Sequence, residues 1–209
     1  MRPLERVHRS WIAERRVLRL AELVKPLLPS GAHVLDVGCG DGRLARRILD
    51  ERPDLRLEGM DILVRVGSAI PVSAFDGQHI PRPDQNVDVV LLVDVLHHAT
   101  SPLALLGEAV RVSRRAVVVK DHVVGGSLDH WQLRLMDDVG NRRFGVALPY
   151  DYWTWDRWQA AWGQLGLRAV ALERNLRLYP GPLDRVFGRG LHLLACLEPV
   201  RGEPVSAGR

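Results

Sequence analysis

Three glycines at alternate positions, Gly38, Gly40 and Gly42, follow a short apolar run and precede a helical pattern. A glycine-rich turn between a strand and a helix lets backbone N–H groups approach a ligand closely, which is typical of nucleotide-like binding. The dinucleotide fingerprint needs a third glycine where this sequence has Arg43, and a phosphate-binding loop needs a lysine followed by serine or threonine, which this turn lacks. The spacing therefore favours a nucleotide-like ligand of another kind.

Two carboxylates accompany the turn, because Asp36 lies just before it and Asp41 lies within it. They would repel a pyrophosphate, but they would stabilise a positively charged ligand through charge-assisted hydrogen bonds and through-space attraction. S-adenosylmethionine carries an ammonium group and a sulfonium, and its own carboxylate can accept hydrogen bonds from backbone N–H groups. The charges around the turn therefore indicate this kind of ligand.

The nine residues from Val34 to Gly42 resemble the first motif of class I methyltransferases. Three later segments follow in the family's order. Asp61 is spaced like the acid that binds the ribose, Phe75-Asp76-Gly77 is similar to the adenine motif, and the segment 87–98 resembles the fourth motif of the type 11 methyltransferases of ubiquinone and menaquinone biosynthesis. The resemblance covers about residues 34–119. It implies an enzyme that uses S-adenosylmethionine, releases S-adenosylhomocysteine and binds the cofactor through Asp36, Gly38, Cys39, Gly40, Gly42, Asp61, Ile62, Asp76, Gly77, Val93 and Asp94.

Candidate catalytic residues follow two apolar runs that we expect to form buried strands. Asp94, His97 and His98 follow one run, and Asp121 and His122 follow the next. Ligands bind beyond the carboxyl ends of the strands in an open α/β sheet, and a neutral histidine can take a proton from an acceptor at neutral pH. We therefore expect His98, His122 or His97 to act in catalysis, although a strand-end histidine is more often structural. We expect no metal site, because adjacent histidines do not readily face one ion.

The alternation of strand and helix patterns predicts how these residues are positioned. An apolar helical pattern over 11–28 leads the chain, and further helices are expected at 43–51, 61–69 and 101–110. Unbroken apolar runs are typical of strands covered on both faces of a parallel sheet. The chain therefore predicts a doubly wound, three-layer α/β/α fold with a mostly parallel seven-stranded sheet and an antiparallel edge strand. The expected strands are 33–37, 56–60, 71–75, 87–93, 116–119, 167–174 and 191–197.

The expected organisation is a helical cap over residues 1–30, a cofactor-binding domain over 31–200 and a disordered tail over 201–209. Residues 127–166 form a helical insertion in which Trp155, Trp158 and Trp162 recur at helical spacing and predict a core stripe. The role of this insertion and of the linker 179–190 is left open. So are the identity of the acceptor and the oligomeric state.

Composition narrows the choice of partners. The formal net charge is +4 and the pI is 9.6, but basic residues alternate with acidic ones, so nucleic acid is not the expected partner. The two cysteines lie far apart, and the first thirty residues carry charges throughout, which favours a cytoplasmic protein without a membrane span.

Three functions remain in competition. The first is transfer of a methyl group to oxygen or carbon of a small molecule. The second is methylation of RNA or another nucleic acid, although the Asp/Asn-Pro-Pro-aromatic run of amino-directed members is replaced here by Asp94-Val95-Leu96-His97. The third is a non-catalytic module that binds the cofactor, or a dehydrogenase that uses the same crevice.

Overall fold

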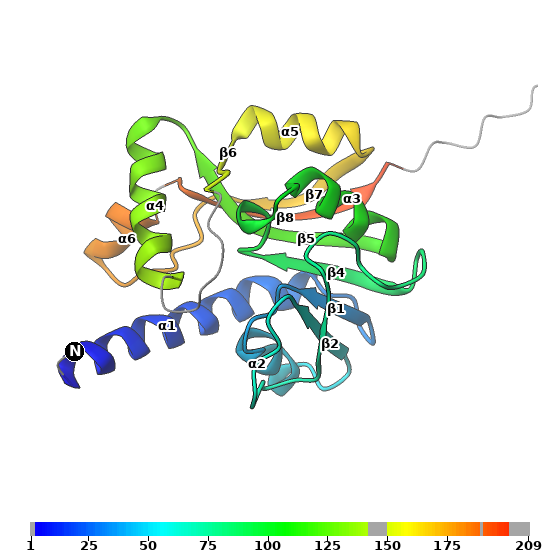
Figure 1. The fold of residues 1–209 in the computed structure, drawn as a ribbon, viewed down its shortest axis with the longest axis horizontal. Helices are drawn as coiled ribbons and strands as arrows, with labels where there is room; N and C mark the ends of the chain where they lie inside the picture. The colour runs from blue at the N-terminus through cyan, green and yellow to red at the C-terminus, as the bar shows by residue number, and fades with distance from the viewer. Residues whose placement is uncertain (1–2, 142–149, 189, 201–209) are drawn as a thin grey trace, which may run out of the picture.

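The structure is a computed structural model and describes residues 3–141, 150–188 and 190–200. Seven strands form one sheet in the order β3-β2-β1-β4-β5-β8-β7, and a short additional strand, β6, pairs with the end of β5 (Figure 1). The strands are β1 (His33–Val37), β2 (Arg56–Asp61), β3 (Val72–Ala74), β4 (Val87–Val93), β5 (Ser113–Val124), β6 (Trp153–Thr154), β7 (Leu167–Glu173) and β8 (His192–Pro199).

Helices connect most of these strands. The α-helices are α1 (Pro3–Val24), α2 (Arg43–Glu51), α3 (Pro102–Val112), α4 (Ser127–Asn141), α5 (Trp155–Gln164) and α6 (Pro182–Phe187). Two 3-10 turns, η1 (Lys25–Leu27) and η2 (Leu96–His98), follow α1 and β4. Chain order and sheet order differ, since β1 pairs with both β2 and β4. The strand order therefore switches at β1, and a doubly wound sheet binds its ligand at such a switch point.

The sheet is mostly parallel, as predicted. Strands β3, β2, β1, β4 and β5 pair in parallel, whereas β8 is antiparallel to both β5 and β7. The sequence predicts that the last two strands form an antiparallel pair at the edge of the sheet, and this is confirmed: β7 is outermost and pairs antiparallel with β8, which lies between β7 and β5.

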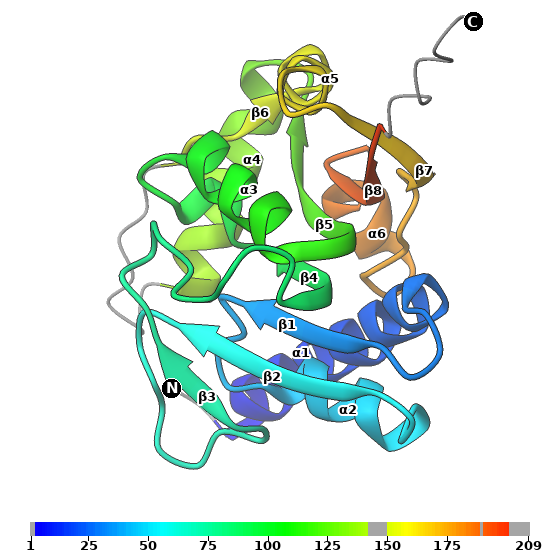
Figure 2. The same cartoon turned by 90° about the vertical axis from the view of Figure 1, so that its right-hand side faces the viewer.

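Helices cover both faces of the sheet, which gives the predicted three layers (Figure 2). On one face α1 and α2 pack against β1, β4 and β5 through Val24, Ile48 and Val89. On the other face α3 and α5 pack through residues such as Leu106 and Trp158. Buried apolar strand residues lie in both clusters, so the unbroken apolar runs follow from burial on two sides.

Three local expectations need correction. Residues 61–69 form no helix, because the apolar side chains that follow Asp61 are exposed and give a helix no face to bury. The strand expected at 116–119 extends over the whole of β5. The linker 179–190 contains α6. The expected tail, 201–209, lies outside the described residues.

The tryptophan stripe is confirmed as part of the core. Trp158 and Trp162 are buried on α5, and Trp155 packs against the same cluster. Across the parts of the chain that the structure describes, every helix is too short or too polar to cross a bilayer.

Candidate active site

The glycine turn is anchored to the end of β2 by backbone hydrogen bonds. The N–H groups of Gly38 and Cys39 both donate to the carbonyl oxygen of Met60, at 2.7 and 3.1 Å. The N–H of Gly40 donates instead to the side chain of Asp61, whose Oδ2 lies 2.8 Å away. Oδ1 of the same carboxylate accepts from the N–H of Leu63 at 2.8 Å. Asp61 therefore joins the turn after β1 to the loop after β2.

Gly38 brings the turn against the segment that follows β4. Its φ is +75°, a region that favours glycine, and a Cβ placed there would lie 2.4 Å from Cγ2 of Val95. Gly40 also has a positive φ, but a Cβ there would meet no atom within 4 Å. The turn is thus closed on the side of Val95 and open at Gly40, where a ligand can approach the backbone.

Two buried carboxyl groups lie beneath the turn. Asp36, near the end of β1, is 3% exposed, and Asp61 is 9% exposed. Burial, together with the negative charge of Asp61, raises the pKa of Asp36 to about 7. Burial and the charges of Asp36 and Asp61 also raise the pKa of the Cys39 thiol, so that it stays protonated. These groups fit a cationic ligand, which would relieve the repulsion between the carboxylates.

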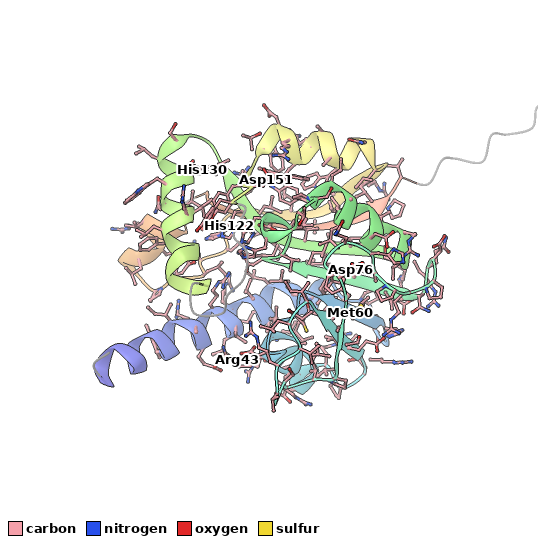
Figure 3. The ribbon with its side chains drawn as sticks, viewed as in Figure 1. Arg43, Met60, Asp76, His122, His130 and Asp151 are labelled. Atoms are coloured by element: carbon pink, nitrogen blue, oxygen red, sulfur yellow. The ribbon has the colours of Figure 1, made fainter. Side chains whose placement is uncertain are left out.

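Asp76 and Gly77 follow β3, where the adenine motif is expected. Oδ1 of Asp76 accepts from the N–H groups of Gln78 and His79 at 2.8 and 2.7 Å, and these bonds lower the pKa of Asp76. Gly77 has a φ of +81°, and a Cβ there would lie 3.1 Å from Cγ2 of Ile62. Gly77 of the expected adenine motif therefore lies close to Ile62, which follows the expected ribose acid, and Asp76 is labelled in Figure 3.

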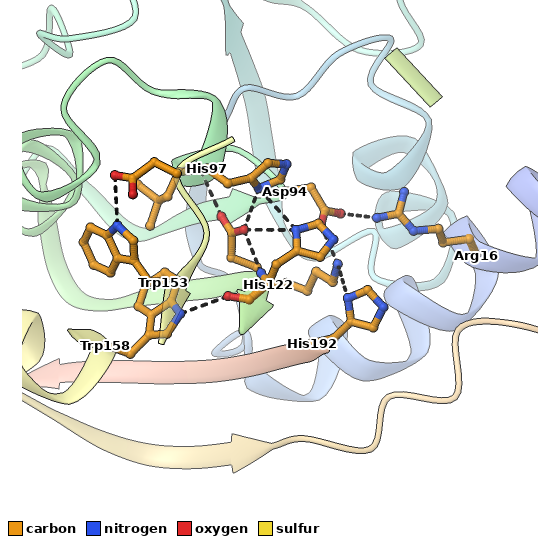
Figure 4. A network of polar contacts seen from close by, with 11 residues as sticks. Arg16, Asp94, His97, His122, Trp153, Trp158 and His192 are labelled. Carbon is orange, nitrogen blue, oxygen red and sulfur yellow. Dashed lines mark hydrogen bonds and ion pairs between the residues drawn. The ribbon is translucent and has the colours of Figure 1, made fainter. Parts of the chain in front are cut away.

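Asp94 follows β4 and lies between two cations. Its carboxylate forms ion pairs with Arg16 of α1 and Lys120 of β5, and Figure 4 shows Arg16 extending from α1 toward it. Burial alone would raise the pKa of Asp94, but Arg16 and Lys120 hold it well below its ordinary value of 3.8. Asp94 also has a φ of +57°, which is uncommon for a residue with a side chain. Val93, just before it, is half-buried at the end of the strand.

The predicted catalytic histidines come together beyond β4 and β5. His97 donates from Nδ1 to Oδ1 of Asp121 at 2.6 Å, and Nδ1 of His122 lies 3.4 Å from Nδ1 of His97. The ring of His98 lies 3.9 Å from that of His97, and His98 is half-buried, whereas His97 and His122 are buried. We refer to His97, His98, His122 and His192 as the histidine cluster.

Charges within the histidine cluster are set by burial and by Asp121. Burial alone would raise the pKa of Asp121, but His97 and His122 hold it well below its ordinary value. Burial, with the nearby charge of His97, lowers the pKa of His122 and favours its neutral form. The cluster therefore holds an ionised carboxylate beside a neutral imidazole.

The structure adds residues that the sequence analysis did not select. His192 of β8 lies opposite His122, donates from Nε2 to the carbonyl oxygen of Phe187 at 3.0 Å and accepts from Lys120 at Nδ1. Lys120 could have been selected from the sequence as a site residue, because it is a charged residue within an apolar run. Arg16 and His192 carried no such signal, since only the fold brings α1 and β8 to this edge.

The chain is similar to known proteins. A family model described as a methyltransferase domain matches residues 5–169. The chain is 29% identical over 128 residues to a tRNA (carboxymethyluridine(34)-5-O)-methyltransferase of Schizosaccharomyces pombe, covering 59% of this chain and 52% of that protein. It is 28% identical over 166 residues to a ubiquinone/menaquinone biosynthesis C-methyltransferase of Cupriavidus metallidurans, covering 70% of this chain and 65% of that protein. The chain thus spans about half to two thirds of the length of these two relatives.

A solved structure agrees with the fold. It is the complex between the Haloferax volcanii Trm112 methyltransferase activator and a putative methyltransferase, in which the matched chain is 17% identical. The match covers 92% of this chain and 97% of that chain, with a TM-score of 0.64. At this level of identity the likeness concerns the fold alone.

Proposed function

Because this chain belongs to the class I methyltransferases that use S-adenosylmethionine, we propose that it transfers the donor's methyl group to an oxygen or an activated carbon of a small-molecule acceptor. One observation carries the proposal. The glycine turn and the histidine cluster lie at the same edge of the sheet, where Gly38 packs against Val95, two residues before His97. A donor on the turn and an acceptor at the histidines would therefore be neighbours.

On the donor side, we assign binding to the turn and to the acids around it. Gly40 leaves open space beside the backbone, Asp61 orders the turn, and a bound cation would favour the ionised form of Asp36 beneath it. Asp76, Gly77 and Ile62 form the wall on the adenine side. When bound, S-adenosylmethionine supplies an electrophilic methyl group on sulfur. The protein's part is to align that group with the acceptor, since in-line displacement depends mainly on position and orientation.

On the acceptor side, we assign proton abstraction to His98. It is the more accessible member of the adjacent pair, whereas the ring of His97 is tied to Asp121. A neutral imidazole beside the acceptor takes the proton that leaves when an oxygen or carbon nucleophile is methylated. His97 and Asp121 then act as positioning residues that fix the turn η2 on which His98 lies.

Surface charge supports a small acceptor over a nucleic acid. Many arginines are already paired with acids close in sequence, for example Arg46 with Asp50 and Arg52 with Asp54. A groove of about 500 Å³ along α1 includes Arg15 and Arg19, but Glu14 and Glu22 line it as well. Nucleic-acid binding would need basic groups clustered on one face.

RNA methylation is the second candidate, and the relative from Schizosaccharomyces pombe is the observation that favours it. The test is to incubate the purified protein with donor labelled on the methyl group, and with either a panel of phenols, quinols and small hydroxy acids or total tRNA. We expect label in a small molecule and none in tRNA. Label in tRNA would establish the second candidate, and binding of S-adenosylhomocysteine without turnover on either set would indicate a non-catalytic module.

A further inference from the structure

Two imidazoles and a carboxylate converge on one point beyond the ends of β4 and β5. Nδ1 of His97 lies 2.6 Å from Oδ1 of Asp121. Nδ1 of His122 lies 3.4 Å from each of those two atoms. All three residues are buried. Figure 4 labels the rings of His97 and His122 within this network.

These separations match the spacing of ligand atoms around a small metal ion. Zinc binds imidazole nitrogen and carboxylate oxygen at about 2.0–2.2 Å, which places neighbouring ligand atoms roughly 3.3 Å apart in a tetrahedral site. The two 3.4 Å separations already have this value. The 2.6 Å contact between His97 and Asp121 has the length of a hydrogen bond, and an ion bound by both atoms would hold them several tenths of an ångström further apart.

Supporting hydrogen bonds orient the carboxylate and hold the backbone of His122. Oδ2 of Asp121 accepts from the N–H of Leu96 at 3.0 Å, and Oδ1 accepts from the N–H of His122 at 2.7 Å. Nε1 of Trp158 donates to the carbonyl oxygen of His122 at 3.0 Å, which fixes the end of β5. Bonds of this kind orient the ligands in known metal sites.

The charge balance also favours a cation at this point. Asp121 is 1% exposed, and among the described residues its ion pairs are with His97 and His122. The neighbouring cations, Arg16 and Lys120, are paired with Asp94 instead. A divalent ion would place further positive charge beside this buried carboxylate, which burial alone disfavours.

We propose that His97, Asp121 and His122 bind one divalent transition-metal ion, with Zn²⁺ as the ion that best matches two imidazoles and one carboxylate. The sequence predicted no metal site, because the adjacent residues His97 and His98 do not readily face one ion. The fold instead joins His97 to two residues of another strand. Three protein ligands leave a fourth position for water or for an oxygen atom of the acceptor. The ion is thus additional to the proposed methyl transfer and does not depend on it.

The alternative is a metal-free network in which the three groups only share protons. A titration separates the two. The full-length protein is treated with a chelator, dialysed and titrated with ZnCl₂ in a calorimeter, alongside His97→Gln, Asp121→Asn and His122→Gln. His130→Gln is the matched control, because His130 lies on α4 near Tyr152 and outside the triad. Binding of S-adenosylhomocysteine and the circular dichroism spectrum report folding in each variant.

We expect one Zn²⁺ per wild-type chain, the same in His130→Gln, and an affinity at least roughly 100-fold weaker in each triad variant, since loss of a supporting group alone costs 10–100-fold. Cobalt added in place of zinc should give the visible absorption of a tetrahedral site in the wild type and in His130→Gln, and not in the triad variants. The proposal is overturned if folded wild-type protein binds no Zn²⁺, or if the triad variants bind it as tightly as the control. Binding of S-adenosylhomocysteine in the same samples separates this result from failure of the proposed function.

Discussion

The side chain of Asp61 accepts a hydrogen bond from the backbone N–H of Gly40 at 2.8 Å. This bond joins the loops after two neighbouring parallel strands, β1 and β2, and it explains the form of the glycine turn. The carboxylate retains further lone pairs for a ligand, because an ionised carboxylate accepts at about four positions. Asp61 can therefore order the turn and contact the donor at once.

Asp36 makes the stability of the protein depend on pH. Its pKa is about 7 when folded and 3.8 ordinarily, so between these values the folded state holds a proton that the unfolded state has lost. Stability from this group is present below pH 4 and is lost as pH rises toward 7, by roughly 4 kcal/mol in all. In Asp36→Asn this loss is absent, so urea unfolding should show the variant gaining stability relative to wild type between pH 5 and pH 8.5. The same gain in the exposed control Asp50→Asn would refute the assignment to Asp36.

Gly38→Ala should weaken donor binding by distorting the turn. The new Cβ meets Val95 and the backbone has a positive φ, so we expect a stability loss of about 1–3 kcal/mol and a clear fall in affinity for S-adenosylhomocysteine. Adding Val95→Ala removes the clash but leaves the strained φ, so the double variant should recover only part of both losses. Thermal unfolding and calorimetry measure the two effects. Wild-type affinity in Gly38→Ala would contradict the close approach described here.

The buried Lys120 and the half-buried Asp94 should stabilise the protein more as a pair than either does alone. Lys120→Met leaves Asp94 with Arg16 alone in a buried setting, and we expect a loss of about 3 kcal/mol in the free energy of unfolding. Asp94→Asn combined with Lys120→Met removes both buried charges and should be more stable than Lys120→Met. Chemical denaturation of the two single variants and the double variant, compared with the wild type, completes a double-mutant cycle. Additive losses would show that the two side chains are not coupled.

His98→Gln should slow methyl transfer without loosening the donor. General-base catalysis contributes about 10²–10⁴-fold, so we expect a fall in kcat of that order with unchanged affinity for S-adenosylhomocysteine. His130→Gln serves as the control on α4 and should keep the wild-type rate. The measurement is initial rate with the acceptor found in the panel described above. A wild-type rate in His98→Gln would remove it from the mechanism.

Most of the fold could be predicted because strands that are buried on both faces appear in the sequence as apolar runs. The run from Val87 to Val93 is apolar except for Asp88 and forms β4 with the predicted bounds. The predicted helix after Asp61 was wrong because the spacing of apolar residues within a segment does not indicate whether the rest of the fold packs against them. The antiparallel pair β7 and β8 at the edge of the sheet was predictable, since no full crossover helix separates these two strands.

The site residues could be predicted where the spacing within one sequence motif determines their positions. They could not be predicted where the fold brings distant segments together. Gly38, Gly40 and Gly42 form a turn with positive φ at each, as their spacing indicates. Arg16 and His192 reach the site only because α1 and β8 pass the ends of β4 and β5. The triad of His97, Asp121 and His122 joins two strands in the same way.

The central claim is that acids around the glycine turn bind a cationic adenosyl donor. Calorimetric titration of S-adenosylmethionine and S-adenosylhomocysteine into wild type, Asp61→Asn and the exposed control Asp50→Asn tests it most directly. We expect binding of both ligands to wild type and to the control, and at least roughly tenfold weaker binding to Asp61→Asn, because a hydrogen bond to a charged group contributes about 1.5–3 kcal/mol. Folded wild-type protein that binds neither ligand would contradict the account.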